Sequence, residues 1–134
     1  MVLAELVTYL AAQGVGTSGT NLFYGFVPPD PDAMVTLFEY GGQPNEPDLG
    51  TVNTRLVFPR VQALARGVRD DYDGPRLKIQ DVVTALTKIL NQSLSSVAYK
   101  AVEPLSDPFF LRRDENFRLE FVCNFKVTKA YSSS

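Results

Sequence analysis

The sequence predicts one α+β domain with two layers, in which two amphipathic helices pack on one face of a mainly antiparallel sheet. The first observation is an alternation of side chains over residues 117–127, which gives a long strand a dry face and a wet face. The second is a pair of segments, residues 3–10 and 79–90, with apolar side chains at helical spacing. Because only one face of the strand is apolar, both helices are expected to cover it. The apolar positions of the strand are Phe117, Leu119, Phe121, Cys123, Phe125 and Val127.

The first forty residues predict a helix and two strands. The helix carries Leu3, Leu6, Val7 and Leu10 on one side and ends at the glycines that follow residue 13. A short strand is predicted at residues 21–26. The proline-rich residues 27–32 are expected to be extended and rigid, because proline fixes its own backbone and restricts the residue before it. A second strand, rich in β-branched and aromatic residues, is predicted at 34–40.

Residues 41–59 are rich in glycine and proline and predict the longest irregular segment of the chain. We expect it to be mobile in the free subunit and to order when it reaches a neighbouring molecule. A third strand follows at residues 60–66, where polar side chains alternate with small apolar ones.

The second helix is expected to begin at Asp73, Gly74 and Pro75, with Asp or Gly as its cap. It is expected to fray over residues 91–96, and strands are predicted at 97–103 and 108–113. A turn at 114–116 then leads into the long last strand. The domain therefore spans residues 1–129, with a flexible tail at 130–134. The apolar positions of the helix are Ile79, Val82, Val83, Leu86, Ile89 and Leu90.

Composition excludes several classes of function. The net charge of −2 gives no general attraction to nucleic acid or to an anionic membrane. The single cysteine, Cys123, cannot form an intrachain disulfide and is interpreted as a buried, inert thiol. The chain has no histidine, so a Ser-His-Asp triad is excluded. The first residues are an amphipathic helix rather than a signal peptide, since they lack a basic start and include Glu5.

Two motifs favour ordinary turns over ligand sites. Residues 14–19 match G-x-G-x-x-G, but they follow a helix and precede a strand, which is the reverse of the dinucleotide-binding arrangement. Residues 70–74 resemble part of a calcium loop, but the alignment puts Arg69 and Gln80 at positions that need carboxylates. No catalytic, cofactor-binding or metal-binding residues are therefore predicted.

Charged turns are the candidates for contacts with a partner or between copies. Asp70, Asp71 and Asp73 form an acidic group, and Arg112 and Arg113 form a basic one. The simpler interpretation of both is a solvated turn, and the sharper one is a contact with a surface of opposite or mixed charge. Just before the basic pair, residues 109 and 110 are both phenylalanine and cannot both face inward from a strand. One of them is expected to be exposed or covered by a neighbour.

The layout resembles the tail terminator proteins of long-tailed bacteriophages, also called tail-to-head joining or minor capsid proteins. The resemblance lies in the N-terminal helix, in residues 21–32 running into 35–42, in residues 60–67, in the helix from Pro75, and in residues 113–118 leading into the last strand. It implies a virion subunit, made in the cytoplasm of the bacterial host, that forms a homohexameric ring on the tail tube. The implied partners are copies of itself, the tail tube protein and the head connector protein. No catalytic residues come with the resemblance.

Two other classes stay open on the residues alone. One is a small intracellular enzyme with an unrecognised site, and the other is a monomeric binding module. A ring that forms with rising concentration would favour the tail protein. A stable monomer that keeps a small molecule through purification would favour the others.

Overall fold

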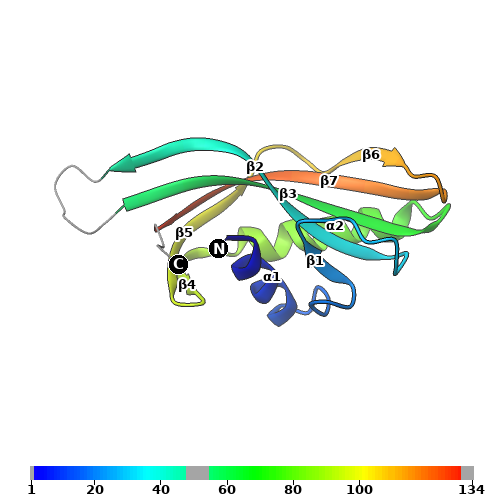
Figure 1. Cartoon of the computed structure of the whole chain (residues 1–134), viewed down its shortest axis with the longest axis horizontal. Helices are drawn as coiled ribbons and strands as arrows, with labels where there is room; N and C mark the ends of the chain where they lie inside the picture. The colour runs from blue at the N-terminus through cyan, green and yellow to red at the C-terminus, as the bar shows by residue number, and fades with distance from the viewer. Residues whose placement is uncertain (1, 48–54, 131–134) are drawn as a thin grey trace.

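The computed structural model describes residues 2–47 and 55–130, and Figure 1 shows their arrangement. Two helices and a large sheet account for most of these residues. In chain order the elements are α1 Val2–Ala12, β1 Leu22–Tyr24, β2 Met34–Pro47, β3 Arg55–Arg69, α2 Asp73–Thr87, β4 Leu90–Leu94, β5 Val97–Pro104, β6 Phe109–Arg113 and β7 Arg118–Ala130.

One sheet contains all seven strands in the order β1-β2-β3-β7-β5-β4, and β6 also pairs with β7. The pairing of β1 with β2 is parallel and the other pairings are antiparallel. Strand β7 lies beside β3 along one edge. Its other edge is shared by β6, near the start of β7, and β5, near its end.

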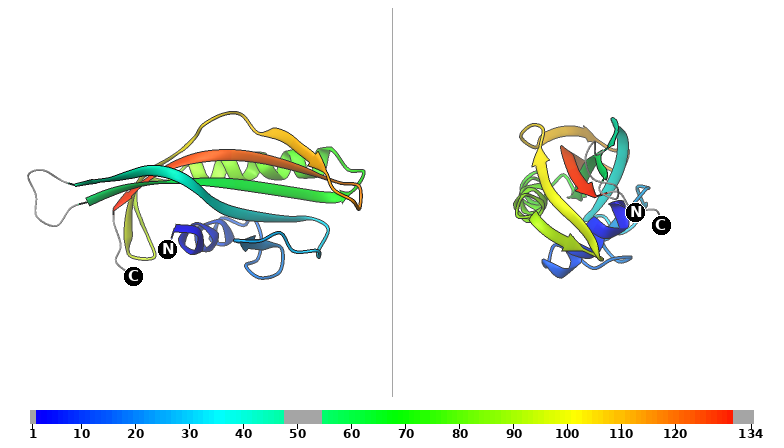
Figure 2. Two further views of the ribbon diagram at one scale, coloured as in Figure 1. Left: turned by 45° about the horizontal axis from the view of Figure 1, so that its top comes forward. Right: turned by 90° about the vertical axis from the view of Figure 1, so that its left-hand side faces the viewer.

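Both helices lie on the same face of this sheet, and Figure 2 shows them there from two further sides. One continuous core joins Leu6 and Leu10 of α1, Ile79 and Leu86 of α2, and the inward side chains of β3 and β7. The predicted two-layer α+β fold is therefore confirmed. We call the other side of the sheet the open face.

The long last strand follows the predicted alternation from Phe121 onward, and Phe121, Cys123, Phe125 and Val127 are buried. The prediction for Phe117 is wrong. This residue precedes β7, has a φ of +61°, and is 41% exposed. The expected wet face is also partly wrong, since Arg118 and Glu120 are buried on the open face.

Two predicted boundaries and one predicted core position also need correction. Strands β2 and β3 extend to Pro47 and from Arg55, so much of the predicted irregular segment at 41–59 is paired strand, and residues 48–54 lie outside the described residues. Strand β4 occupies the region expected to be a fraying helix. Leu90 belongs to β4 and is exposed rather than packed under the sheet.

The extended β2–β3 pair tolerates its glycine and proline residues because the register shifts twice. The shifts fall between the pairs Tyr40–Arg60 and Gln43–Phe58 and again before Glu46–Leu56. Bulges of this kind absorb residues that fit a regular ladder poorly. The pair extends beyond the helices as a two-stranded arm, at the left of Figure 1.

Candidate assembly surface

Two buried arginines hold the proline-rich segment onto the open face. Arg66 of β3 donates from Nε to the carbonyl of Asp32 at 2.9 Å and from Nη2 to that of Pro31 at 2.7 Å. Arg118 of β7 donates from Nη1 to the carbonyl of Pro29 at 2.7 Å and to the Asp32 carboxylate at 3.0 Å. A guanidinium group suits this position because it offers five donors in a fixed plane. The segment is thereby fixed to two different strands.

A small apolar cluster lies on the same face and supports the segment from below. Met34, Leu64 and Val122 are buried there, and Phe23 packs against them. The hydroxyl of Thr36 donates to the carbonyl of Phe26 at 2.7 Å. Apolar packing at Phe23 and hydrogen bonds to Phe26 and to residues 29–32 therefore hold this segment at several points.

Two carboxylates near these arginines form ion pairs, one with Arg118 and the other with Arg112. Asp114 accepts from Nε of Arg118 at 2.8 Å and from the backbone N–H groups of Asn116 and Arg118, both at 2.9 Å. Burial alone would raise the pKa of Asp114, but these hydrogen bonds outweigh it and hold that pKa below its usual value. Glu120, almost fully buried, accepts from Nε of Arg112 at 2.8 Å.

These residues border an open cleft of about 290 Å³. One wall is Val27 to Pro29 and the other is formed by the turn after β6. Its lining contains three guanidinium groups and three carboxylates, so it has no excess charge with which to attract an anion or a cation. Within the described ranges no three His, Cys, Asp or Glu side chains are arranged so that they could hold a metal ion. We interpret the charges as a scaffold that fixes the walls.

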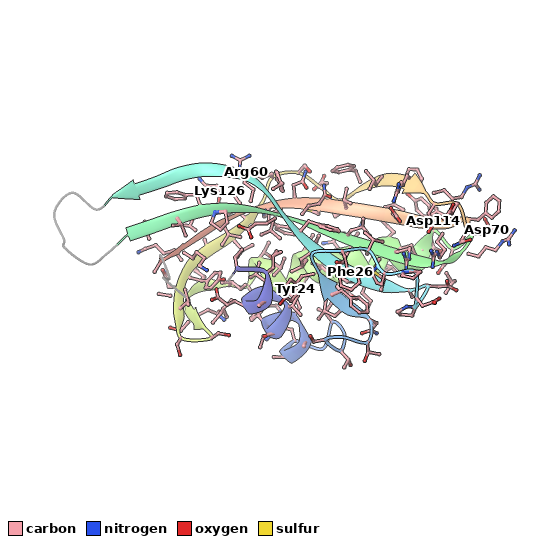
Figure 3. The ribbon with its side chains drawn as sticks, in the orientation of Figure 1. Tyr24, Phe26, Arg60, Asp70, Asp114 and Lys126 are labelled. Carbon is pink, nitrogen blue, oxygen red and sulfur yellow. The ribbon has the colours of Figure 1, made fainter. Side chains whose placement is uncertain are left out.

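The predicted acidic and basic groups meet at one end of a single copy, where Figure 3 labels Asp70 and Asp114. The Asp70 carboxylate lies 3.5 Å from Nε of Arg69 and 3.9 Å from Nη1 of Arg113. The guanidinium carbons of these two arginines lie 4.6 Å and 5.3 Å from the centre of the Phe117 ring. We call Arg69, Asp70, Arg113 and Phe117 the tip.

The other three predicted contact residues lie close to the tip, but two of them have structural roles. The N-cap of α2 is Tyr72 rather than the expected Asp73 or Gly74, and the Asp71 carboxylate, one residue earlier, accepts from the backbone N–H of Gly74 at 3.3 Å. Arg112 is engaged with Glu120. Asp73 is the exposed first residue of α2.

Two groups of exposed apolar side chains lie outside these charges. Phe109, Phe110 and Leu111 of β6 are 43%, 47% and 43% exposed. This group agrees with the expectation that consecutive phenylalanines in a strand cannot both be buried. Tyr24, Phe26 and Val27 form the second group, which the sequence analysis missed. Its only sequence signal was that these large apolar residues border a proline-rich segment.

Cys123 is fully buried, and burial raises the pKa of its thiol to about 11, which leaves it unreactive at neutral pH.

Within residues 2–47 and 55–130, no helix has the length and apolar character needed to cross a bilayer.

Comparison with known proteins identifies the family. A model of the family "Bacteriophage tail terminator protein" matches residues 9–131. No curated protein sequence matches the chain. A chain from the virion of a native gene transfer agent (GTA) particle has a similar fold, with a TM-score of 0.61, 16% identity, and coverage of 96% of this chain and 92% of that chain.

A second solved structure is more distant. It comes from an extracellular contractile injection system and is described as the PVC sheath/tube terminator in the extended state. Its TM-score is 0.43 at 13% identity, with 99% of this chain and 58% of that chain covered. The family match extends over most of the chain, from α1 to the end of β7. This protein belongs to the bacteriophage tail terminator family.

Proposed function

We propose that six copies of this chain form a closed ring that caps the tail tube, stops its polymerisation and joins the tail to the head connector. The observation that carries the proposal is the tail terminator family match over residues 9–131. The number six and the connector come from the resemblance of the sequence to tail-to-head joining proteins. The chain is then a minor structural protein of the virion, made in the bacterial cytoplasm before assembly.

The surface of the subunit supports a structural role over an enzymatic one. The cleft on the open face is neutral, and its three guanidinium groups are engaged with carboxylates or with backbone carbonyls. A catalytic centre would be expected to hold a group poised to exchange a proton or attack a substrate. In contrast, the exposed apolar groups on β6 and beside β1 suit burial against another protein.

Electron microscopy of the purified protein tests the proposal, first alone and then with tail tubes of the same phage. Rings should appear as the concentration rises, and added rings should end tubes at a defined length. Bovine serum albumin at the same concentration is the control, because it shows whether added protein alone changes the length of the tubes. A protein that stays monomeric even with tubes present would overturn the proposal and would favour the binding-module alternative.

A further inference from the structure

Two apolar groups lie at opposite edges of the sheet. The β6 strip consists of Phe109, Phe110 and Leu111, on the strand that flanks β7. The β1 patch consists of Tyr24, Phe26 and Val27, which end β1 and begin the proline-rich segment. Figure 3 labels Tyr24 and Phe26 of the patch, and Figure 1 shows β6 away from β1 across the sheet.

The register places both groups at the same level of the sheet. Phe23 pairs with Thr36, which pairs with Leu64, and the row continues through Val122 to Phe109. Five strands are crossed in this row, so at a spacing of about 4.8 Å the two edges lie roughly 19 Å apart. When a second copy is placed beside the first along the direction of this row, the β6 strip of one copy therefore lies next to the β1 patch of the other.

The β6 strip lacks the protection that exposed edges usually have. Edge strands are commonly guarded by charged side chains that project into solvent. Here Arg112 is bonded to Glu120, and Arg113 lies against Asp70 and Phe117, so both guanidinium groups are directed to their own subunit. Among the described residues, β6 pairs with no strand other than β7. Phe109, opposite Val122, lies on the open face, and Phe110 packs against Phe121 on the helix face, so exposed apolar side chains flank this open edge on both faces.

The β1 patch is held rigidly before any partner binds. The Phe26 ring packs edge-on against Phe23, with centroids 5.6 Å apart, and its carbonyl accepts from Thr36. The following residues are fixed by Arg66 and Arg118. A contact surface that is already ordered loses little conformational entropy on association. The buried arginines of the open face thus fix the chain immediately after the patch.

We propose that the β6 strip of one copy packs on the β1 patch of the next copy, and that this contact links subunits around the ring. The inference rests on the proposed ring function. The two groups differ and lie on opposite edges, so their union is head-to-tail and repeats until the ring closes. Pairing of two β6 strips would instead stop at a dimer. Six side chains are less than a stable interface needs, so polar residues around them complete the contact.

Two single substitutions and a mixing experiment test this contact. Phe109→Lys places a charge in the strip, and Phe26→Lys places one in the patch. Leu77→Lys is the matched control, because Leu77 is the more exposed side chain at 64% and lies on α2, which contributes to neither group. All three sites are on the surface, so circular dichroism should show folded protein in each case. Leu111→Lys and Val27→Lys replace any variant that does not fold.

Native mass spectrometry at a concentration where the wild type forms rings gives the readout. Wild type and Leu77→Lys should give the same ring, and Phe109→Lys and Phe26→Lys should each lose at least 90% of it. An equal mixture of the two defective variants should form dimers and nothing larger, because each pair retains one intact strip and one intact patch. Rings from either variant, or a mixture that stays monomeric, would overturn the contact and leave the ring function standing. A monomeric wild type, with and without tubes, would instead remove the ring function and this contact with it.

Discussion

Asp70 and Phe117 are joined by a backbone hydrogen bond, and both adopt a left-handed conformation, which aspartate tolerates and phenylalanine disfavours. The N–H of Asp70 donates to the carbonyl of Phe117 at 2.8 Å, and their φ angles are +57° and +61°. Left-handed backbone costs a bulky L-residue such as phenylalanine about 1–2 kcal/mol. The two chain reversals at this end of the molecule, after β3 and before β7, are therefore locked together at a local energetic cost.

The backbone of Phe117 predicts an unusual order of stability for two substitutions. Phe117→Ala removes the ring from between Arg69 and Arg113 and keeps the strained φ, whereas Phe117→Gly also relieves the strain. The glycine variant should be the more stable of the two by about 1 kcal/mol. Urea unfolding of both variants measures the difference. The opposite order, which is usual inside strands, would show that the left-handed backbone is not kept in solution.

Phe121 should be far more sensitive than Phe117, although both were predicted on the same dry face. It is 1% exposed, and its ring meets Tyr72 and Phe110 edge-on at 5.1 Å and 5.6 Å. Phe121→Ala removes a large buried side chain and should destabilise the fold by roughly 3–5 kcal/mol. Thermal and urea unfolding check this value. A loss well under 1 kcal/mol would mean that this face of β7 is not the core.

The sequence predicted the packed face of β7 well because alternation is a local property of the chain. Nothing local indicates that Arg118 and Glu120, on the other face, are also buried. Their cover depends on distant partners, since Arg118 reaches the carbonyl of Pro29 from 89 residues away. A polar residue that binds a remote carbonyl has the same sequence pattern as one that points into water. The pattern therefore predicted a solvated face, and this prediction is wrong where residues 27–32 lie over the strand.

The surroundings of the candidate contact residues also depend on distant partners, which the local sequence does not indicate. Charged turns could be recognised from the sequence, but their neighbours depend on register. The pairing of β6 with β7 sets Arg112 opposite Glu120, and the turn after β3 brings Asp70 to Arg113. The acidic and basic groups, which we expected to be unlike surfaces that meet between copies, therefore lie together on one copy. Their role between copies stays a prediction.

Arg112 and Arg113 should respond differently to reversal of charge. Arg112→Glu places a carboxylate against Glu120, which is 1% exposed, and should destabilise the fold by about 1–3 kcal/mol. Because Arg112 is itself 61% exposed, solvent screening favours the lower end of that range. Arg113→Glu affects an exposed ion pair and a contact with the exposed Phe117 ring, and should change stability by no more than about 0.5 kcal/mol. Equal melting temperatures for the two variants would contradict the assigned role of Arg112.

Arg113→Glu is consequently the cleaner test of the tip as a contact between copies. A variant with both arginines reversed would combine loss of folding with loss of assembly. If the tip takes part in the ring, Arg113→Glu should remain folded and should weaken ring formation, and low salt should accentuate the effect. Normal rings and normal tail lengths from this variant would exclude the tip from the contact.

A buried ion pair joins the first helix to the last strand. Glu5 of α1 accepts from Nζ of Lys129 of β7 at 2.8 Å and from the hydroxyl of Tyr99 of β5 at 2.5 Å. Burial alone would raise the pKa of Glu5, but the hydrogen bonds from Lys129 and Tyr99 outweigh it and hold that pKa below its ordinary value of 4.5. Burial, together with the hydrogen bond to Glu5, raises the pKa of Tyr99, which remains protonated.

Glu5→Gln should therefore be destabilising at neutral pH and much less so in acid. Removal of one partner leaves Lys129 buried opposite a neutral group, with a loss of about 3 kcal/mol at pH 7. Below pH 4.5 the unfolded wild type takes up a proton at residue 5, while the folded wild type still holds a carboxylate there. Wild-type stability from this group is thus present above pH 4.5 and is lost as the pH falls toward the folded pKa. Urea unfolding of both proteins from pH 7 to pH 3 should show the gap between them narrowing, and a gap that stays constant would mean that Glu5 is not ionised in the fold.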